Sequence, residues 1–212
     1  MTIGKAFGAG DPINLVDEEG ERPRIYIQNG GFGHAFITTG EGVKTTVYSY
    51  GRYGALNRYS GKTSGQSTPS GEGVLRILKG KDAATYLNKV FDEGGFSVFE
   101  CFKGDDALID AFFEEKFKNG SDPSDPLKET YNNPNSRAIN RYSLLFQNCV
   151  TTTLSAASIG QCGIFSKAIT PLELNNDLRI FNPGSVKVVN NPKVFLLELL
   201  TRTMGRSLQL IQ

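Results

Sequence analysis

The sequence predicts an α+β protein in which a mainly antiparallel sheet packs against helices. Three observations lead to this prediction. Short runs of β-branched and aromatic residues, bounded by glycine and proline, occupy residues 24–50 and return at 74–78 and 96–102. Apolar residues recur at helical spacing between residues 82 and 120. The composition, with 39% hydrophobic and 21% charged residues, is that of a folded globular protein.

The length suits a single folded unit. At roughly 100–200 residues per domain, a chain of 212 residues makes one domain with room for a lobe. We expect one domain over residues 1–212, with an irregular lead-in over 1–22 and a helical lobe around 81–136. The lead-in is rich in Gly, Asp and Glu.

The first third of the chain is predicted to form strands. Residues 24–28 are a β-prone run between proline and glycine. Residues 34–39 and 43–50 are two further runs of this kind, joined by a glycine-containing loop at 40–42. A loop of this length between two β-prone runs predicts a hairpin.

The middle of the chain is predicted to be more helical. Apolar residues recur at helical spacing after Asp82, a suitable N-cap, and the pair Gly94-Gly95 ends the run. The other expected elements are a loop over 51–73, a strand over 74–78, a strand over 96–102, a helix from Asp105 or Asp106 to Gly120, a loop over 119–136, a helix opening near Cys149, a helix around 171–180 and a terminal helix from Pro192 to about Met204.

The charge and the apolar pattern exclude several classes of protein. Lys and Arg number 23 against 22 Asp and Glu, so we expect no nucleic-acid-binding surface. No apolar run reaches the ~18 residues that cross a bilayer, so no membrane span is expected. The first residues lack the apolar region of a Sec signal peptide. We therefore expect a protein that is made in the cytoplasm and leaves it, if at all, through a specialised secretion system.

Three cysteines and one histidine narrow the chemistry. An odd number of cysteines in a chain without a Sec signal argues against a disulfide framework. No C-x-x-C pair is present, so a structural zinc site is not favoured. We expect no metal and no cofactor. An imidazole base, if the protein uses one, must be His34.

Among the three thiols, Cys149 is the best candidate nucleophile. It follows Gln147-Asn148, which can end a strand and cap a helix, so Cys149 is expected in the first helical turn. Free backbone N–H groups and the helix dipole at that position lower the pKa of a thiol and can stabilise an oxyanion. Cys101 and Cys162 are interpreted as structural residues. A role as a small buried residue stays open for Cys149 as well.

His34 is expected at the start of a strand, directly after the glycine-rich residues 29–33. Small residues there allow another chain or a substrate to approach the imidazole closely. The structural alternative is a half-buried histidine at a strand end. A histidine at a strand start and a cysteine at a helix start are what a thiol–imidazole pair requires.

Three short motifs contain these residues: Gly-His-Ala-Phe-Ile at 33–37, Val-Tyr-Ser-Tyr-Gly at 47–51, and residues 142–153, which include Asn148-Cys149. Together they resemble the papain-like cysteine hydrolases of the NlpC/P60 superfamily, and more closely its circularly permuted branch. In that branch the histidine hairpin precedes the cysteine helix, as it does here. The resemblance implies a papain-like fold over residues 1–212 with Cys149 and His34 as catalytic residues.

The resemblance also implies a third polar residue, on the strand that pairs with the histidine strand and on the same face as the imidazole. If the apolar residues of both strands point into one core, alternation places His34, Thr46 and Tyr48 on the opposite face. A register shift of one residue would bring Ser49 there instead. We take Tyr48 as the expected third residue, with Thr46 and Ser49 as alternatives.

The resemblance implies a cysteine hydrolase that cleaves an amide bond, with a peptide or peptidoglycan as its substrate. Such an enzyme without a Sec signal fits an antibacterial toxin delivered by a secretion machine, for example a type VI effector with a cognate immunity protein. Two alternatives stay open. The same residues could serve a thiol acyltransferase or (thio)esterase on lipid or protein substrates, or they could be incidental in a non-catalytic binding module.

Overall fold

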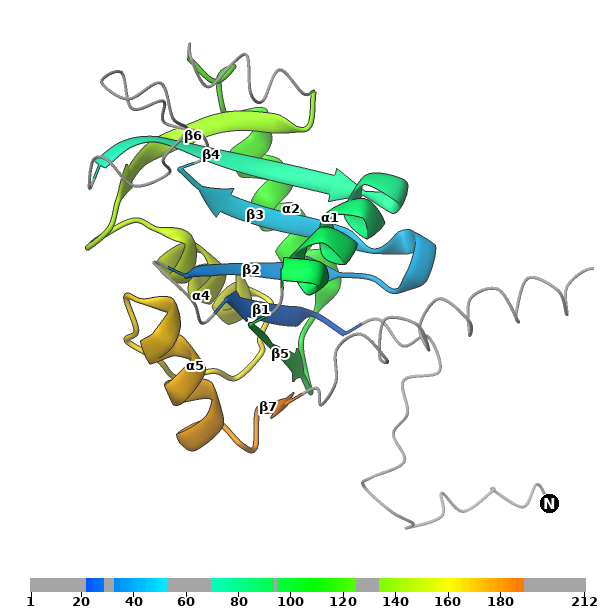
Figure 1. Cartoon of the computed structure of the whole chain (residues 1–212), viewed down its shortest axis with the longest axis vertical. Helices are drawn as coiled ribbons and strands as arrows, with labels where there is room; N and C mark the ends of the chain where they lie inside the picture. Colours follow the sequence, from blue (N-terminus) through cyan, green and yellow to red (C-terminus); the bar gives the residue numbers. More distant parts are fainter. Residues whose placement is uncertain (1–21, 29–32, 53–69, 94, 125–133, 189–212) are drawn as a thin grey trace, which may run out of the picture.

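A computed structural model describes residues 22–28, 33–52, 70–93, 95–124 and 134–188. Its centre is a seven-stranded sheet with the order β6-β4-β3-β2-β1-β5-β7 (Figure 1), and every neighbouring pair of strands is antiparallel. The strands are β1 (Arg24–Gln28), β2 (His34–Thr39), β3 (Thr46–Gly51), β4 (Ser70–Lys79), β5 (Phe96–Cys101), β6 (Ser136–Ser143) and β7 (Val186–Val188).

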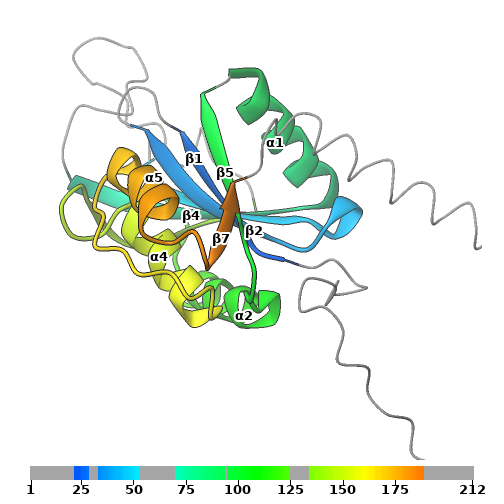
Figure 2. The ribbon, with the colours of Figure 1, turned by 90° about the horizontal axis from the view of Figure 1, so that it is seen from below.

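Helices cover both faces of the sheet, as Figure 2 shows. Helix α1 (Gly80–Glu93) packs on one face, and α2 (Asp106–Lys118), α4 (Cys149–Ile159) and α5 (Pro171–Ile180) pack on the other. We call these the α1 face and the three-helix face. The predicted α+β class, an antiparallel sheet packed against helices, is confirmed.

Strand alternation divides the core between the two faces. In β1, Ile25 and Ile27 belong to the core of the three-helix face, whereas Tyr26 between them packs against Phe36 in the core of the α1 face. Side chains of successive strand residues point to opposite sides of a sheet. A sheet with helices on both faces therefore buries both halves of the alternating pattern.

The turn between β2 and β3 is longer than predicted. Thr39 pairs with Thr46, so residues 40–45 form the connection in place of the predicted loop at 40–42. A short 3-10 helix, η1 (Gly42–Lys44), lies within it. Gly40 enters the turn with a φ of 66°, a conformation that glycine adopts without strain.

This longer turn changes which residues share a face. If the loop consisted of residues 40–42, Thr39 would pair with residue 43. In the structure Thr39 pairs with residue 46. The difference is an odd number of positions, which turns every side chain of β3 to the other face. Ile37 therefore lies opposite Tyr48 on the three-helix face, while Val47 and Ser49 face α1. The expectation that the apolar residues of both strands point into one core is wrong.

The region around 81–136, expected as a helical lobe, contributes to all three layers. It supplies α1 to one face, α2 to the other, and β5 to the sheet between β1 and β7. Asp105 is the N-cap of α2, and its side chain accepts a hydrogen bond from the Leu108 N–H at 3.2 Å.

Several expected segments lie wholly or partly outside the described residues: the lead-in over 1–22, residues 29–32, much of the loop over 51–73, part of the loop over 119–136 and the terminal helix over 192–204.

Cys101 and Cys162 form a disulfide, with their Cα atoms 5.3 Å apart. This corrects the expectation, drawn from the odd number of cysteines and the missing Sec signal, that argued against a disulfide framework. Two cysteines can pair and leave a third free, and the free one is Cys149. Cys101 is fully buried as expected, but it is a half-cystine and not an isolated small residue.

Within the described part of the chain, no helix combines the length and the apolar character that crossing a membrane requires.

Candidate functional site

Cys149 is the first residue of α4, as the sequence predicted. Asn148 is the N-cap: its side chain accepts a hydrogen bond from the Thr151 N–H at 3.0 Å, and the Thr151 hydroxyl accepts one from the Asn148 N–H at 2.9 Å. The Asn148 amide also donates to the carbonyls of Leu144 at 2.6 Å and Ile169 at 2.9 Å. This one side chain fixes the start of the helix and both loops beside it.

The Cys149 thiol is buried in the core of the three-helix face, with only 5% of the residue exposed. Burial raises the pKa of this thiol, even though the N–H groups of Ala35 and Val150 and the hydroxyl of Tyr142 donate hydrogen bonds to the sulfur. The expected donors at the helix start are therefore present, but desolvation outweighs them. The expectation of a lowered thiol pKa is wrong, and the resting protein holds a neutral thiol.

His34 begins β2 at a place where β2 and β3 separate. The two strands pair only from Ile37 and Tyr48 to Thr39 and Thr46, although β2 begins at His34 and β3 continues to Gly51. The His34 Nε2 atom lies 2.8 Å from the Ser49 hydroxyl across this opening.

The Ser49 hydroxyl is in turn 3.3 Å from the Tyr86 hydroxyl of α1, and the His34 ring centroid lies 6.0 Å from that of Phe36. The imidazole therefore belongs to the α1 face. Burial, followed by the positive charge of Arg76, lowers the pKa of His34 to about 4. The imidazole is neutral at pH 7, which is the state that a general base requires.

The structure brings Cys149 to the residue next to His34. The Ala35 N–H that donates to the sulfur belongs to the peptide unit that joins His34 to Ala35. Because neighbouring strand residues point to opposite faces, the thiol lies on the three-helix face and the imidazole on the α1 face. The hydrogen bonds described above join each side chain to the sheet, and they do not join the imidazole to the thiol.

Tyr48, the expected third residue, contacts a different part of the protein. Its hydroxyl donates to the Asp110 carboxylate of α2 at 2.7 Å, and its ring stacks on Phe113 with centroids 4.5 Å apart. Burial and the neighbouring carboxylate raise its pKa. Thr46 is buried in the ladder with Thr39. Of the three hydroxyl residues considered, Ser49 is the one that the structure pairs with His34.

Gly33 places the start of α5 beside His34. Its φ is 67°, and a Cβ at this position would lie 2.8 Å from side-chain atoms of Pro171 and 2.7 Å from the Gln28 carbonyl. Both the backbone conformation and the close contact with Pro171 require glycine at this position.

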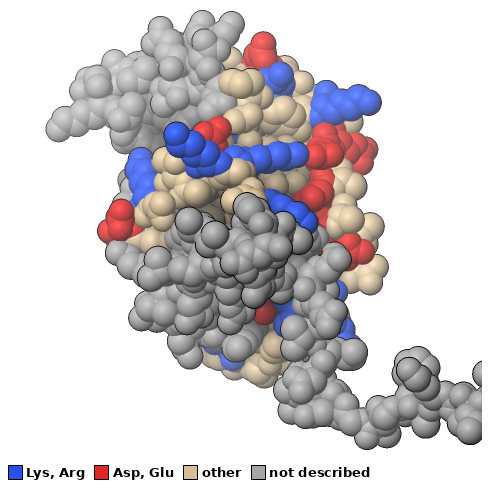
Figure 3. All heavy atoms as spheres, turned by 90° about the vertical axis from the view of Figure 1, so that its right-hand side faces the viewer, with Lys and Arg blue, Asp and Glu red and all other residues tan. Residues whose placement is uncertain are grey.

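The described residues contain no group of three or more His, Cys, Asp or Glu side chains that could hold a metal ion. On the face of the molecule in Figure 3, basic and acidic side chains lie next to one another.

No protein-family model and no curated protein matches this chain. Among solved structures, the chain is similar to the crystal structure of the type VI secretion system effector TseH, with 15% sequence identity and a TM-score of 0.47. The similarity covers 80% of this chain and 98% of that chain. At this identity and TM-score the similarity carries no argument about this chain.

We expect His34 to make the stability of the protein depend on pH. Its pKa is about 4 in the folded state and near 6.5 in an unfolded chain. Between these values the unfolded state binds a proton that the folded state does not, so stability is complete above about pH 6.5 and falls as the pH approaches 4. The expected loss is ~1–3 kcal/mol, since the side chain keeps some contact with solvent.

Urea unfolding of the wild type and of His34→Asn at pH 7 and pH 4.5 measures this effect. The difference in the free energy of unfolding between the wild type and the variant should shrink at the lower pH. Carboxylates elsewhere affect both proteins equally. An equal difference between the two proteins at both pH values would show that the folded protein does not lower the pKa of His34.

Proposed function

We propose that this protein is a cysteine hydrolase in which Cys149 is the nucleophile, His34 the general base and Ser49 the residue that orients the imidazole. One observation carries the proposal: the only free thiol of the chain lies at a capped helix start, hydrogen-bonded to the backbone N–H that follows the only histidine. Acyl transfer by a thiol requires a nucleophile, a base that takes its proton and a group that orients the base; here the nucleophile and the base lie next to the same peptide unit, on opposite faces of β2.

The protonation states suggest the order of events. Both the thiol and the imidazole are neutral at rest, so the thiol proton has to move as the sulfur attacks the carbonyl carbon. The imidazole of His34 receives that proton and then passes it to the leaving amine, which leaves a thioester on Cys149. Water, deprotonated by the same imidazole, hydrolyses the thioester and regenerates the thiol.

This sequence of steps requires the imidazole to reach the three-helix side of β2. His34 is the first residue of its strand, where it pairs with Gln28 of β1 and β3 is no longer paired with β2. Because the Cα–Cβ bond of a strand residue fixes the face of its side chain, the imidazole reaches the other side only if the backbone at this strand end changes conformation. Substrate binding would select that changed conformation. Catalytic hydrogen bonds are often incomplete before substrate binds and form only in the complex.

The first substrate to test is peptidoglycan, because the three motifs of the sequence resemble peptidoglycan hydrolases. Purified sacculi are incubated with the wild type and with Cys149→Ala, and the released muropeptides are identified by mass spectrometry. The proposal predicts fragments from one type of amide or peptide bond with the wild type alone. The same fragments from both proteins, or none from either, would contradict it.

The proposal extends to delivery as an antibacterial effector. Such an enzyme meets its substrate outside the cytoplasm, so directing it to the periplasm of a test bacterium with an added Sec signal should cause lysis. Expression in the cytoplasm should be tolerated, and Cys149→Ala should be harmless in both places. Toxicity in the cytoplasm alone would argue for an intracellular substrate.

A second candidate function follows from the surface beside Cys149. The turn before Asn148 exposes 61% of Leu145 and 81% of Phe146, and Leu172 at the start of α5 is 59% exposed. Apolar side chains around a nucleophile suit an acyl chain, which favours a thiol acyltransferase or (thio)esterase. Release of p-nitrophenol from long-chain acyl esters, with no release of muropeptides, would select this function over amide hydrolysis.

Ser49→Ala is expected to lower the rate of hydrolysis by about 10-fold to 100-fold, the scale of one or two hydrogen bonds lost at the transition state. Tyr48→Phe should leave the rate nearly unchanged and reduce stability by roughly 1–2 kcal/mol, because it removes a buried hydrogen bond to Asp110. Steady-state kinetics and urea unfolding of both variants measure the two effects. A larger rate loss in Tyr48→Phe would assign the orienting role to Tyr48.

A further inference from the structure

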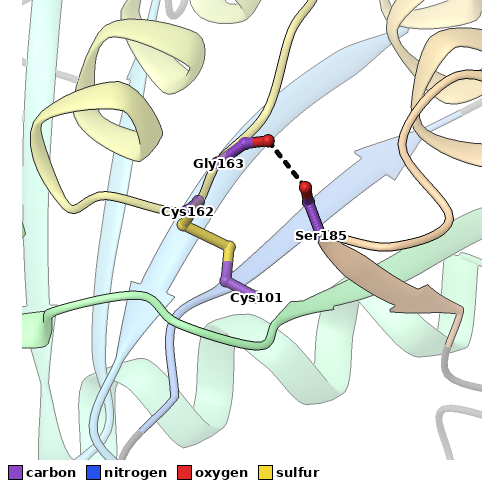
Figure 4. The surroundings of a disulfide bond; sticks show 4 residues. All are labelled: Cys101, Cys162, Gly163 and Ser185. Atoms are coloured by element: carbon purple, nitrogen blue, oxygen red, sulfur yellow. Dashed lines mark hydrogen bonds between the residues drawn. A yellow bond between two sulfur atoms is a disulfide. The ribbon is translucent and has the colours of Figure 1, made fainter.

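The disulfide lies at the opposite end of α4 from the candidate nucleophile. Cys101 is the last residue of β5, and Cys162 follows the end of α4 (Figure 4). The two half-cystines are 0% and 1% exposed. Helix α4 has 11 residues, so at 1.5 Å per residue its two ends are ~16 Å apart. The bond therefore forms without involving Cys149.

Several separate segments of the chain meet around this bond. The Cys101 N–H donates to the Pro23 carbonyl at 2.9 Å, and the Phe102 N–H donates to the Ser185 carbonyl at 3.1 Å. The Ser185 hydroxyl donates to the Gly163 carbonyl at 2.7 Å, as Figure 4 shows. The starts of β1 and β7 and the ends of β5 and α4 thus meet at one place. The disulfide lies there and links the end of β5 to the residues after α4.

A cross-link at this position constrains a large part of the chain. The two cysteines are 61 residues apart in sequence, and the closed loop includes α2, β6 and α4. A disulfide that closes a long loop stabilises a protein chiefly by restricting its unfolded state. Such bonds form and persist in oxidising compartments, while the cytosol keeps thiols reduced.

We propose that this chain reaches its full stability only in an oxidising compartment, where closure of the Cys101–Cys162 disulfide fixes the end of α4 to β5. The proposal concerns folding and does not depend on the hydrolase function. In a reducing cytosol the two residues remain thiols, and the newly made chain is less stable. A protein built in this way becomes more stable once it reaches an oxidising compartment.

The closing reaction is thiol–disulfide exchange with an oxidising carrier that contains a disulfide. One thiolate of the pair attacks a carrier sulfur, forming a mixed disulfide and releasing one carrier thiol. The second thiolate of the pair attacks the mixed disulfide at the first cysteine and releases the other carrier sulfur as a thiol. Two protein thiols are oxidised, one carrier disulfide is reduced to two thiols, and the two protons of the protein pass to the carrier.

The test is refolding of the full chain with oxidised glutathione or with excess reductant, followed by two measurements. Alkylation with N-ethylmaleimide in denaturant, read by mass spectrometry, should add one group to the oxidised protein and three to the reduced one. Thermal unfolding should give a Tm about 10 °C lower for the reduced protein. The doubly substituted Cys101→Ala/Cys162→Ala protein should unfold near the reduced Tm in both conditions.

Cys149→Ser is the matched control, because it removes the one thiol outside the pair. It should keep the dependence of Tm on reductant and should add no group when oxidised and two when reduced. Three alkylated thiols after oxidative refolding, a mixed pairing that includes Cys149, or equal Tm values in the two conditions would each overturn the proposal. Since neither measurement uses activity, the result is independent of the hydrolase test.

Discussion

Replacing Cys149 by alanine is expected to abolish hydrolysis, with a loss of at least about 10³-fold in kcat/KM. Without the sulfur no thioester can form, and the neutral imidazole has no thiol to deprotonate. The measurement is release of muropeptides, or turnover of a fluorogenic amide derived from them, by matched amounts of both proteins. Retention of more than about a tenth of the wild-type rate would exclude Cys149 as the nucleophile.

The control for this experiment has to separate lost chemistry from lost folding. The Cys149 side chain is buried in the core. Replacing it by alanine therefore leaves a small cavity and lowers the free energy of unfolding by ~1 kcal/mol. Cys149→Ser, which nearly keeps the volume, should be as inactive as Cys149→Ala. Cys101→Ala/Cys162→Ala should remain active while folded, although it loses more stability because it removes the disulfide.

The helix start that holds Cys149 could be predicted because its determinants are local in sequence. Asn148 is a residue type that favours the N-cap position, and the residues after it lack glycine and proline over the length of the helix. The same holds for Asp105 before α2 and for Thr170, which caps α5 in front of Pro171. Capping depends on three or four neighbouring residues, so one sequence is enough to find it.

The third residue of the site could not be placed in the same way. Its identity depends on whether Thr39 pairs with residue 43 or with residue 46, and the run Val43-Lys-Thr45 is β-prone enough to be read as strand. In the structure it forms η1 and the turn after it. The sequence signal that favours Ser49 is weak: Gly40 and Gly42 are both in the turn and both have positive φ, which allows a longer connection.

The pKa values of the site and the disulfide depend on contacts between distant parts of the chain. The thiol pKa at a helix start follows from local N–H groups only if the site is open to water, and here the sheet and the tyrosine of β6 bury the sulfur. Similarly, nothing in the spacing of Cys101 and Cys162 brings them together; the pairing of β5 with β1 and the packing of α4 do so.

His34→Gln is expected to remove nearly all hydrolytic activity at pH 7, by a factor on the order of 10³ or more. Because the pKa of the buried Cys149 thiol is raised, almost no thiolate exists at neutral pH without a base to take the proton. The rate of the variant should therefore rise about tenfold per pH unit on the alkaline side, as hydroxide replaces the imidazole. The wild type should be nearly independent of pH from about 5 to 8, because its His34 has a pKa of about 4.

The pH profile distinguishes a base from a structural histidine. If His34 only supported the fold, His34→Gln would lower the rate by the same factor at every pH, and the two profiles would be parallel. Glutamine can keep a hydrogen bond to Ser49 but cannot take a proton, so the substitution removes basicity more than contacts.

Alkylation of Cys149 by iodoacetamide provides a second measurement. The alkylation rate should be low at pH 6 in both proteins and should increase with pH, because neither protein holds a thiolate at rest. Fast alkylation of the wild type alone at pH 6 would instead reveal a thiolate–imidazolium pair and contradict the neutral pair proposed for this site.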